Sequence, residues 1–144
     1  MSNIFQGKRL EWSEENLQFA IESIKKNLTR ELVPPGWRNA NSRNPMGGHC
    51  HNATGALYML FGPEYLQLWQ GNSPGPNGNA LHFWVTVKGS DRLIDITVDQ
   101  YGKEGYDYSI GHRSTMLGHS PYYNAKEVYE RVLRDFYGES LNLF

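Results

Sequence analysis

The order of the hydrophobic patterns along the chain restricts its fold more than any other feature of the sequence. Apolar residues recur with helical spacing in three segments, residues 13–32, 50–61 and 124–138. Residues 81–98 instead read "LHFWVTVKGSDRLIDITV", in which two arms rich in β-branched and aromatic residues flank the turn "KGSD" and predict a β-hairpin. The order of helix, loop, helix, hairpin, loop and helix therefore predicts an α+β fold with a small antiparallel sheet.

Local signals mark the ends of the predicted helices. Ser13 can cap the first helix, and the following "VPPGW" is expected to stop it. Gly62 and Pro63 end the second helix. Asn124 is expected to cap the third helix and Gly138 to end it.

Two stretches lack helix or strand periodicity. The sequence "GNSPGPNGNA", residues 71–80, is dense in glycine, proline and asparagine, which predicts a flexible connection. Residues 99–121 are expected to form a loop between the hairpin and the last helix.

Length, charge and cysteine content restrict the class of protein. The 144 residues predict a single domain, 1–144, with its own core. A formal net charge of -1 indicates neither nucleic acid nor an anionic membrane as a partner. No apolar run is long enough for a membrane span, and the start "MSNIFQGKRL" lacks the apolar region of a signal peptide. A single cysteine cannot form an intrachain disulfide, so we expect a cytoplasmic protein with a reduced thiol.

The stretch "GGHCHNATGALYMLFG", residues 47–62, places this cysteine, Cys50, at the start of the second predicted helix. The unpaired N–H groups and the dipole of a helix N-terminus favour a thiolate, and Gly48 lets another molecule approach the backbone. Cys50 is therefore a candidate nucleophile, and the alternatives are a packed core cysteine or a zinc ligand together with His49, His51 and His82. Adjacent side chains diverge too much for three ligands on one ion, so we expect no metal.

A base and an orienting group follow on the predicted hairpin. His82 opens its first strand and Asp95 closes the second, so the two side chains are expected to lie side by side. A carboxylate that bonds one imidazole nitrogen turns the other nitrogen toward a thiol. Cysteine, histidine and aspartate together supply the nucleophile, base and orienter of cysteine catalysis. Asp99 is the alternative orienter if the strand ends early.

The motifs "GHCHNATGALYML", "HFWVTV" and "LIDITVDQY", in this order, resemble the transglutaminase-like branch of the papain-type cysteine enzymes. They are more closely similar to a group of bacterial and phage proteins with the pattern G-H-C, H-x-W and D-x-T-x-x-Q, and the resemblance covers residues 47–113. It implies a papain-like fold in which the cysteine helix packs on a small antiparallel sheet. It also implies that Cys50 is the nucleophile, His82 the base and Asp95 the orienter, without a cofactor.

The oxyanion of an acyl-transfer intermediate needs two hydrogen-bond donors. The backbone N–H of Cys50 is one natural donor. Papain-like enzymes take the second from an amide side chain several residues before the cysteine, and Asn44 occupies a comparable place here. The usual residue is glutamine, whose side chain is longer.

Five further residues are candidates for the substrate site. His49 is expected to flank the cleft or to be solvated, and Trp84 to shield the imidazole of the base or to pack in the core. Gln100 would contact substrate or hydrogen-bond a loop. His112 and Arg113 would line the substrate cleft or lie in an exposed loop.

The reaction expected from these residues is acyl transfer through a thioester. We expect a cysteine-dependent amide or acyl hydrolase, a peptidase, isopeptidase or deamidase, that acts on a peptide, a protein or a small amide. Two alternatives remain open at this point. One is transfer of the acyl group to an amine, as in a transglutaminase, and the other is a non-catalytic peptide- or ligand-binding protein on the same scaffold.

Overall fold

The structure, a computed structural model of the whole chain, describes residues 7–32, 49–75, 78–98, 106–114 and 122–138. Over these residues it is an α+β fold of three α-helices and a four-stranded antiparallel sheet, which confirms the predicted class. The helices are α1 (Glu14–Asn27), α3 (Cys50–Phe61) and α4 (Tyr122–Tyr137). The strands are β1 (Leu66–Gly75), β2 (Gly78–Val87), β3 (Leu93–Ile94) and β4 (His112–Arg113).

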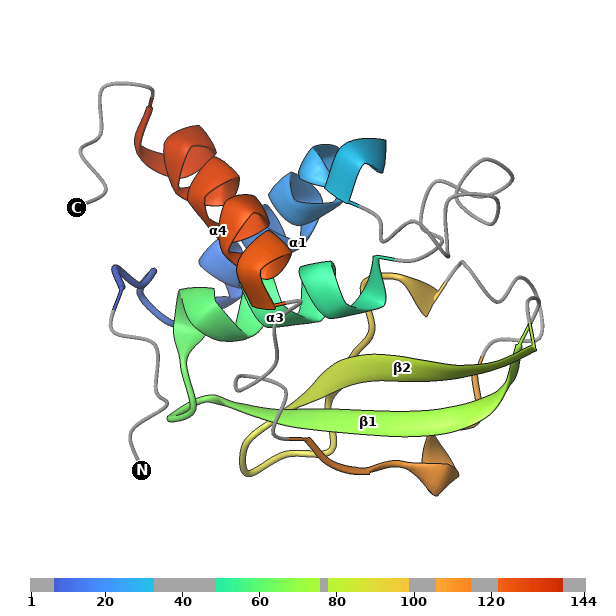
Figure 1. Cartoon of the computed structure of the whole chain (residues 1–144). Helices are drawn as coiled ribbons and strands as arrows, with labels where there is room; N and C mark the ends of the chain where they lie inside the picture. Colours follow the sequence, from blue (N-terminus) through green and yellow to red (C-terminus); the bar gives the residue numbers. More distant parts are fainter. Residues whose placement is uncertain (1–6, 33–48, 76–77, 99–105, 115–121, 139–144) are drawn as a thin grey trace.

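The elements form layers, as Figure 1 shows. The helix α3 packs directly on β1 and β2, and α1 and α4 pack on α3 from the side away from the sheet. The segment that carries η4 (Tyr108–Ile110) and β4 lies beyond β1 as seen from the helices, and β4 forms that edge of the sheet. Within the described ranges, no helix combines the length and the apolar character needed to cross a membrane.

The first helix begins as predicted but ends earlier. The Ser13 hydroxyl accepts a hydrogen bond from the Asn16 N–H at 3.0 Å, which caps α1. The helix ends at Asn27 rather than at residue 32, and a short 3₁₀ turn, η1 (Arg30–Leu32), follows. The carbonyl of Asn27 accepts a hydrogen bond from Arg131 of α4 at 3.2 Å, so an inter-helix contact satisfies it in place of a further helical turn.

The second and third helices agree closely with the sequence. Helix α3 has the predicted bounds and ends at Gly62, whose φ of 90° few other residues adopt easily. Helix α4 begins two residues before Asn124, whose side chain therefore does not act as the predicted cap and donates instead to a carbonyl of η1 at 3.1 Å. Gly138 follows the last turn with φ 100°, as expected for a helix stop.

The sheet has the order β3-β2-β1-β4, and every neighbouring pair is antiparallel. The predicted hairpin is the β2–β3 pair, although its second arm contains only two strand residues. The prediction of a flexible connection over residues 71–80 is wrong, because most of these residues extend β1 and β2 into one long hairpin. Backbone pairing between the two arms outweighs the low strand propensity of their glycine, proline and asparagine residues. The predicted loop over residues 99–121 also contains β4 and a 3₁₀ turn, η4 (Tyr108–Ile110).

Side chains alternate between two different faces of the sheet. Phe83 and Val85 of β2 face α3 and belong to the hydrophobic core. His82 and Trp84 alternate with them and lie on the opposite, outer face of the strand, where His82 also meets the start of α3 through Cys50. The outer face therefore carries the histidine that the sequence singled out.

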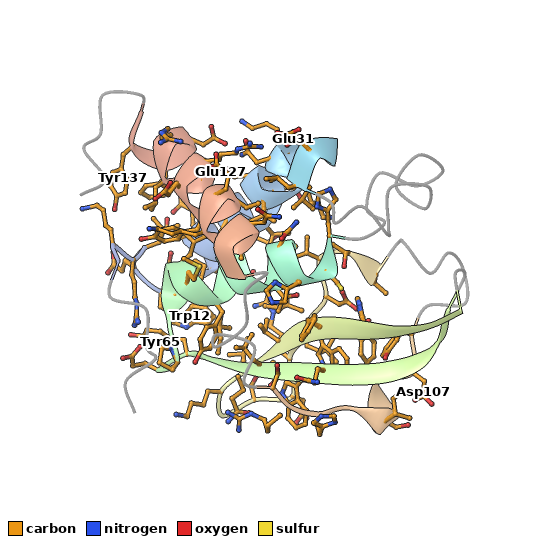
Figure 2. The ribbon with its side chains drawn as sticks, viewed as in Figure 1. Trp12, Glu31, Tyr65, Asp107, Glu127 and Tyr137 are labelled. Atoms are coloured by element: carbon orange, nitrogen blue, oxygen red, sulfur yellow. The ribbon has the colours of Figure 1, made fainter. Side chains whose placement is uncertain are left out.

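Figure 2 shows two places where segments distant in sequence meet outside this core. Trp12, before α1, stacks on Tyr65, which lies just before β1, with ring centroids 5.0 Å apart. On the helical side, Arg131 forms ion pairs with Glu127 at 2.9 Å and with Glu31 at 3.1 Å. These exposed ion pairs add little stability; the pair with Glu127 lies within α4, and the pair with Glu31 connects α4 to η1.

Candidate active site

The start of α3 brings Cys50 to the β2 strand. Thr54, one turn further along α3, donates a hydrogen bond to the Phe83 carbonyl of β2 at 3.1 Å. Residues at positions i and i+4 share a helix face, so Cys50 faces the same strand. Its thiol is hydrogen-bonded to His82, and the residue is partly exposed.

The predicted pairing of His82 with Asp95 is present in the structure. The β2–β3 register sets Val85 opposite Ile94, so Asp95 follows directly beside the His82 end of the strand. The Nε2 atom of His82 lies 2.6 Å from Oδ2 of Asp95. The two side chains are 0% and 2% exposed, so this pair is shielded from water. With Nε2 taken by the carboxylate, Nδ1 is the ring nitrogen that remains for the sulfur.

The surroundings of His82 favour its charged form. Burial lowers its pKa. The hydrogen bonds with Asp95 and Cys50 and the negative charge of these partners raise the pKa by a larger amount, so that it lies at about 9. The imidazole is therefore protonated at neutral pH. A positively charged ring therefore lies next to the Cys50 sulfur, at the N-terminus of α3.

An aromatic cluster covers the outer side of His82. Its ring centroid lies 4.6 Å from that of Tyr106 and 5.8 Å from that of Trp84. Trp84, only 2% exposed, also contacts Tyr106 at 5.5 Å and Tyr108 at 5.0 Å. These rings keep solvent from the imidazole on this side, which agrees with the shielding position expected for Trp84.

Tyr108 contacts the site, although the sequence pattern did not single it out. Its hydroxyl donates a hydrogen bond to Oδ2 of Asp95 at 2.7 Å, so this oxygen accepts from both Tyr108 and His82. Burial and the nearby carboxylate raise the pKa of Tyr108 above its ordinary value. The only signal in the sequence was the tyrosine-rich composition of the segment, which does not single out one ring.

His49 is placed differently from the expectation. A solvated His49 is wrong, because the residue is 0% exposed. Its Nδ1 lies 3.3 Å from Nδ2 of Asn52, and Asn52 also donates to the Leu32 carbonyl at 3.0 Å, so the ring lies beside α3 and η1. Burial lowers the pKa of His49 to about 4, and the ring is neutral at pH 7. His51 is partly buried and packs edge-on against Phe83.

The structure does not bring His112 and Arg113 next to His82. Both residues are exposed on β4, which pairs with β1, so β1 lies between them and β2. Arg113 lies over the ring of Trp69, 5.9 Å from its centroid. An exposed position, one of the two expectations for this pair, agrees with the structure.

Four candidates lie outside the described residues, and their roles stay predictions: Asn44, Gly48, Asp99 and Gln100. As for metal ligands, the part of the chain that the structure describes contains no group of three histidine, cysteine or acidic residues arranged to hold an ion.

Comparison of the chain with protein-family models, with curated proteins and with solved structures found no match. The functional argument therefore depends on the geometry of Cys50, His82 and Asp95 and on the groups that surround them.

Proposed function

We propose that the protein is a cysteine-dependent amide or acyl hydrolase with a papain-like, transglutaminase-like core. Cys50 is the nucleophile, His82 the general base and acid, and Asp95 the group that orients His82. One observation carries the proposal, the continuous hydrogen-bonded series from the Cys50 thiol through His82 to Asp95, with 2.6 Å between Nε2 and Oδ2.

The environment of each group suits its role. Cys50 is partly exposed and can meet a substrate, whereas His82 and Asp95 are buried and keep a fixed geometry. A buried histidine with a carboxylate on one nitrogen has a fixed ring orientation and presents the other nitrogen in a defined direction. A cysteine that served only for packing would not need a charged pair beside it.

The reaction proceeds in two halves. The Cys50 sulfur attacks the acyl carbon, and the oxyanion that forms is stabilised by backbone N–H groups at the start of α3. The bond to the leaving amine or alcohol breaks as His82 gives that group a proton, and a thioester on Cys50 remains. Water, deprotonated by His82, then attacks the thioester and releases the carboxylic acid and the thiolate.

The first test uses p-nitrophenyl acetate, a general activated acyl donor. We expect a burst of about one nitrophenolate per protein molecule, and an acetyl group on Cys50 by mass spectrometry of the digested protein. Cys50→Ala should abolish the burst. His82→Ala keeps the sulfur and should slow acetylation by about 10²-fold or more, because the general base is lost.

Equal nitrophenolate release from the wild type and Cys50→Ala, with acetylation only on lysines, would contradict the proposal. If the burst is present, release of ammonia from glutamine-containing peptides would indicate deamidation. New peptide termini would instead indicate peptide-bond hydrolysis.

A further inference from the structure

Sheet pairing fixes the backbone of His82, which lies within β2, but it does not fix the backbone of Asp95. The strand β3 ends at Ile94, so Asp95 lies outside the β2–β3 pairing. Among the described residues, the buried Oδ1 of Asp95 has no hydrogen-bond partner. The two described bonds of its side chain both go to Oδ2, one from His82 and one from Tyr108.

We propose that Tyr108 is a positioning residue of this site, whose hydroxyl fixes the Asp95 carboxylate so that Oδ2 faces Nε2 of His82. The inference rests on the proposed function, because it gives Tyr108 a part in the same reaction. Tyr108 does not contact the sulfur in this account and acts only through Asp95.

Tyr108 is itself held firmly on the outer face of the sheet. Its ring contacts Trp84 edge-on at 5.0 Å and Tyr106 at 5.5 Å. The turn η4 is closed by Asp107, whose Oδ1 accepts from both the N–H and the hydroxyl of Ser109, at 3.0 and 2.6 Å. Figure 2 shows Asp107 at this turn, on the side of the sheet away from the helices. The ring contacts and the hydrogen bonds within η4 therefore fix the position from which the Tyr108 hydroxyl donates to Asp95.

The position of the Tyr108 proton gives this contact a role during turnover. When His82 passes its proton to the leaving group, it loses its positive charge and its attraction to Asp95 weakens. The hydroxyl of Tyr108 stays protonated at neutral pH, since its pKa is raised, and it continues to donate to Oδ2. Tyr108 thus keeps the carboxylate aligned while His82 is neutral.

The experiment compares Tyr108→Phe with Tyr129→Phe. Tyr129 donates its hydroxyl to the Lys8 carbonyl in the helical layer, so this matched control also loses one tyrosine hydrogen bond. Two quantities are measured, the pKa of His82 by ¹⁵N NMR and the rate of Cys50 acetylation by p-nitrophenyl acetate. In Tyr108→Phe we expect the His82 pKa to fall toward its value in Asp95→Asn, and acetylation to slow by about tenfold. Tyr129→Phe should change neither.

A double substitution shows whether Tyr108 acts through Asp95. In the Asp95→Asn background, Tyr108→Phe should cause no further slowing, because the carboxylate that it positions is gone. Equal slowing in both backgrounds, a rise of the His82 pKa in Tyr108→Phe, or no change would overturn the inference. If Cys50 does not acetylate in the wild type, the proposed function fails, and the NMR shift still decides whether Tyr108 positions Asp95.

Discussion

His49 and His82 are both fully buried, yet they carry different charges at neutral pH. Burial lowers the pKa of both rings. Only His82 has a carboxylate and a thiol as partners, and these raise its pKa to about 9, whereas that of His49 falls to about 4. The partner of a buried histidine, rather than its burial, thus decides whether it carries a charge in this protein.

The neutral His49 predicts a specific loss of stability in acid. Its pKa is near 6.5 in the unfolded chain and about 4 in the folded one, so below pH 6.5 the unfolded state binds the proton first. The stability present above pH 6.5 is therefore lost as the pH falls toward 4, by up to about 3 kcal/mol. Urea denaturation from pH 7 to 4 measures this loss.

The control for that prediction is His49→Gln, which has no titrating ring at this position. Its unfolding free energy should fall less steeply than that of the wild type over the same pH range. Carboxylates that do not act on His49, such as Glu14, contribute equally in both proteins and cancel in the comparison. Parallel pH curves for the two proteins would show that His49 is not a buried neutral group.

At the scale of elements, the segment with η4 and β4 closes the outer face over His82. Gly111 lies directly against the indole of Trp84, and a Cβ atom there would come within 2.4 Å of Trp84 Cζ2. The φ of Gly111 is -76°, so its backbone suits other residues, and the indole is the group that most strongly excludes a side chain. Gly111 therefore allows the segment to approach the sheet closely.

Gly111→Ala is expected to destabilise the protein by about 1–3 kcal/mol, since the added methyl group must displace the Trp84 ring. Denaturant unfolding measures this cost. In a Trp84→Phe background, the smaller ring leaves space and the same substitution should cost less. The same cost in both backgrounds would mean that the methyl group does not meet the indole.

The sequence was sufficient to predict the positions of the helices but not the positions of all the strands. Helical periodicity, Ser13 and Gly138 placed the helices to within a few residues, because these signals are local. The strand β1 was missed, since its second half consists of residues that usually break strands. Its pairing with β2 is a tertiary effect that no local pattern reports.

The difference between local sequence signals and tertiary contacts also explains which site residues could be predicted. Cys50, His82 and Asp95 could be placed together because a helix start and a hairpin bring them close. Tyr108 could not, because it lies in a segment without periodicity that packs on the sheet from outside. The burial of His49 was also missed, since it depends on η1, which is distant in the sequence, as well as on Asn52.

At the scale of the whole molecule, the site lies where the helical layer meets an incomplete edge of the sheet. The strand β3 pairs only with Val85 and Thr86, so His82 lies beyond its end. The first turn of α3 reaches β2 at this place, and the Cys50 thiol meets the histidine there. A longer β3 would continue alongside β2 at His82, so the short strand is part of how the fold forms the site.

The most direct test of the central claim is the rate at which iodoacetamide alkylates Cys50 between pH 5 and 9. The wild type should react at pH 6 about tenfold faster than free cysteine or more, because the charged His82 lies next to the attacking sulfur. His82→Ala should remove this advantage. A wild-type rate that follows free cysteine across the range, unchanged in His82→Ala, would contradict the claim that Cys50 and His82 form a reactive pair.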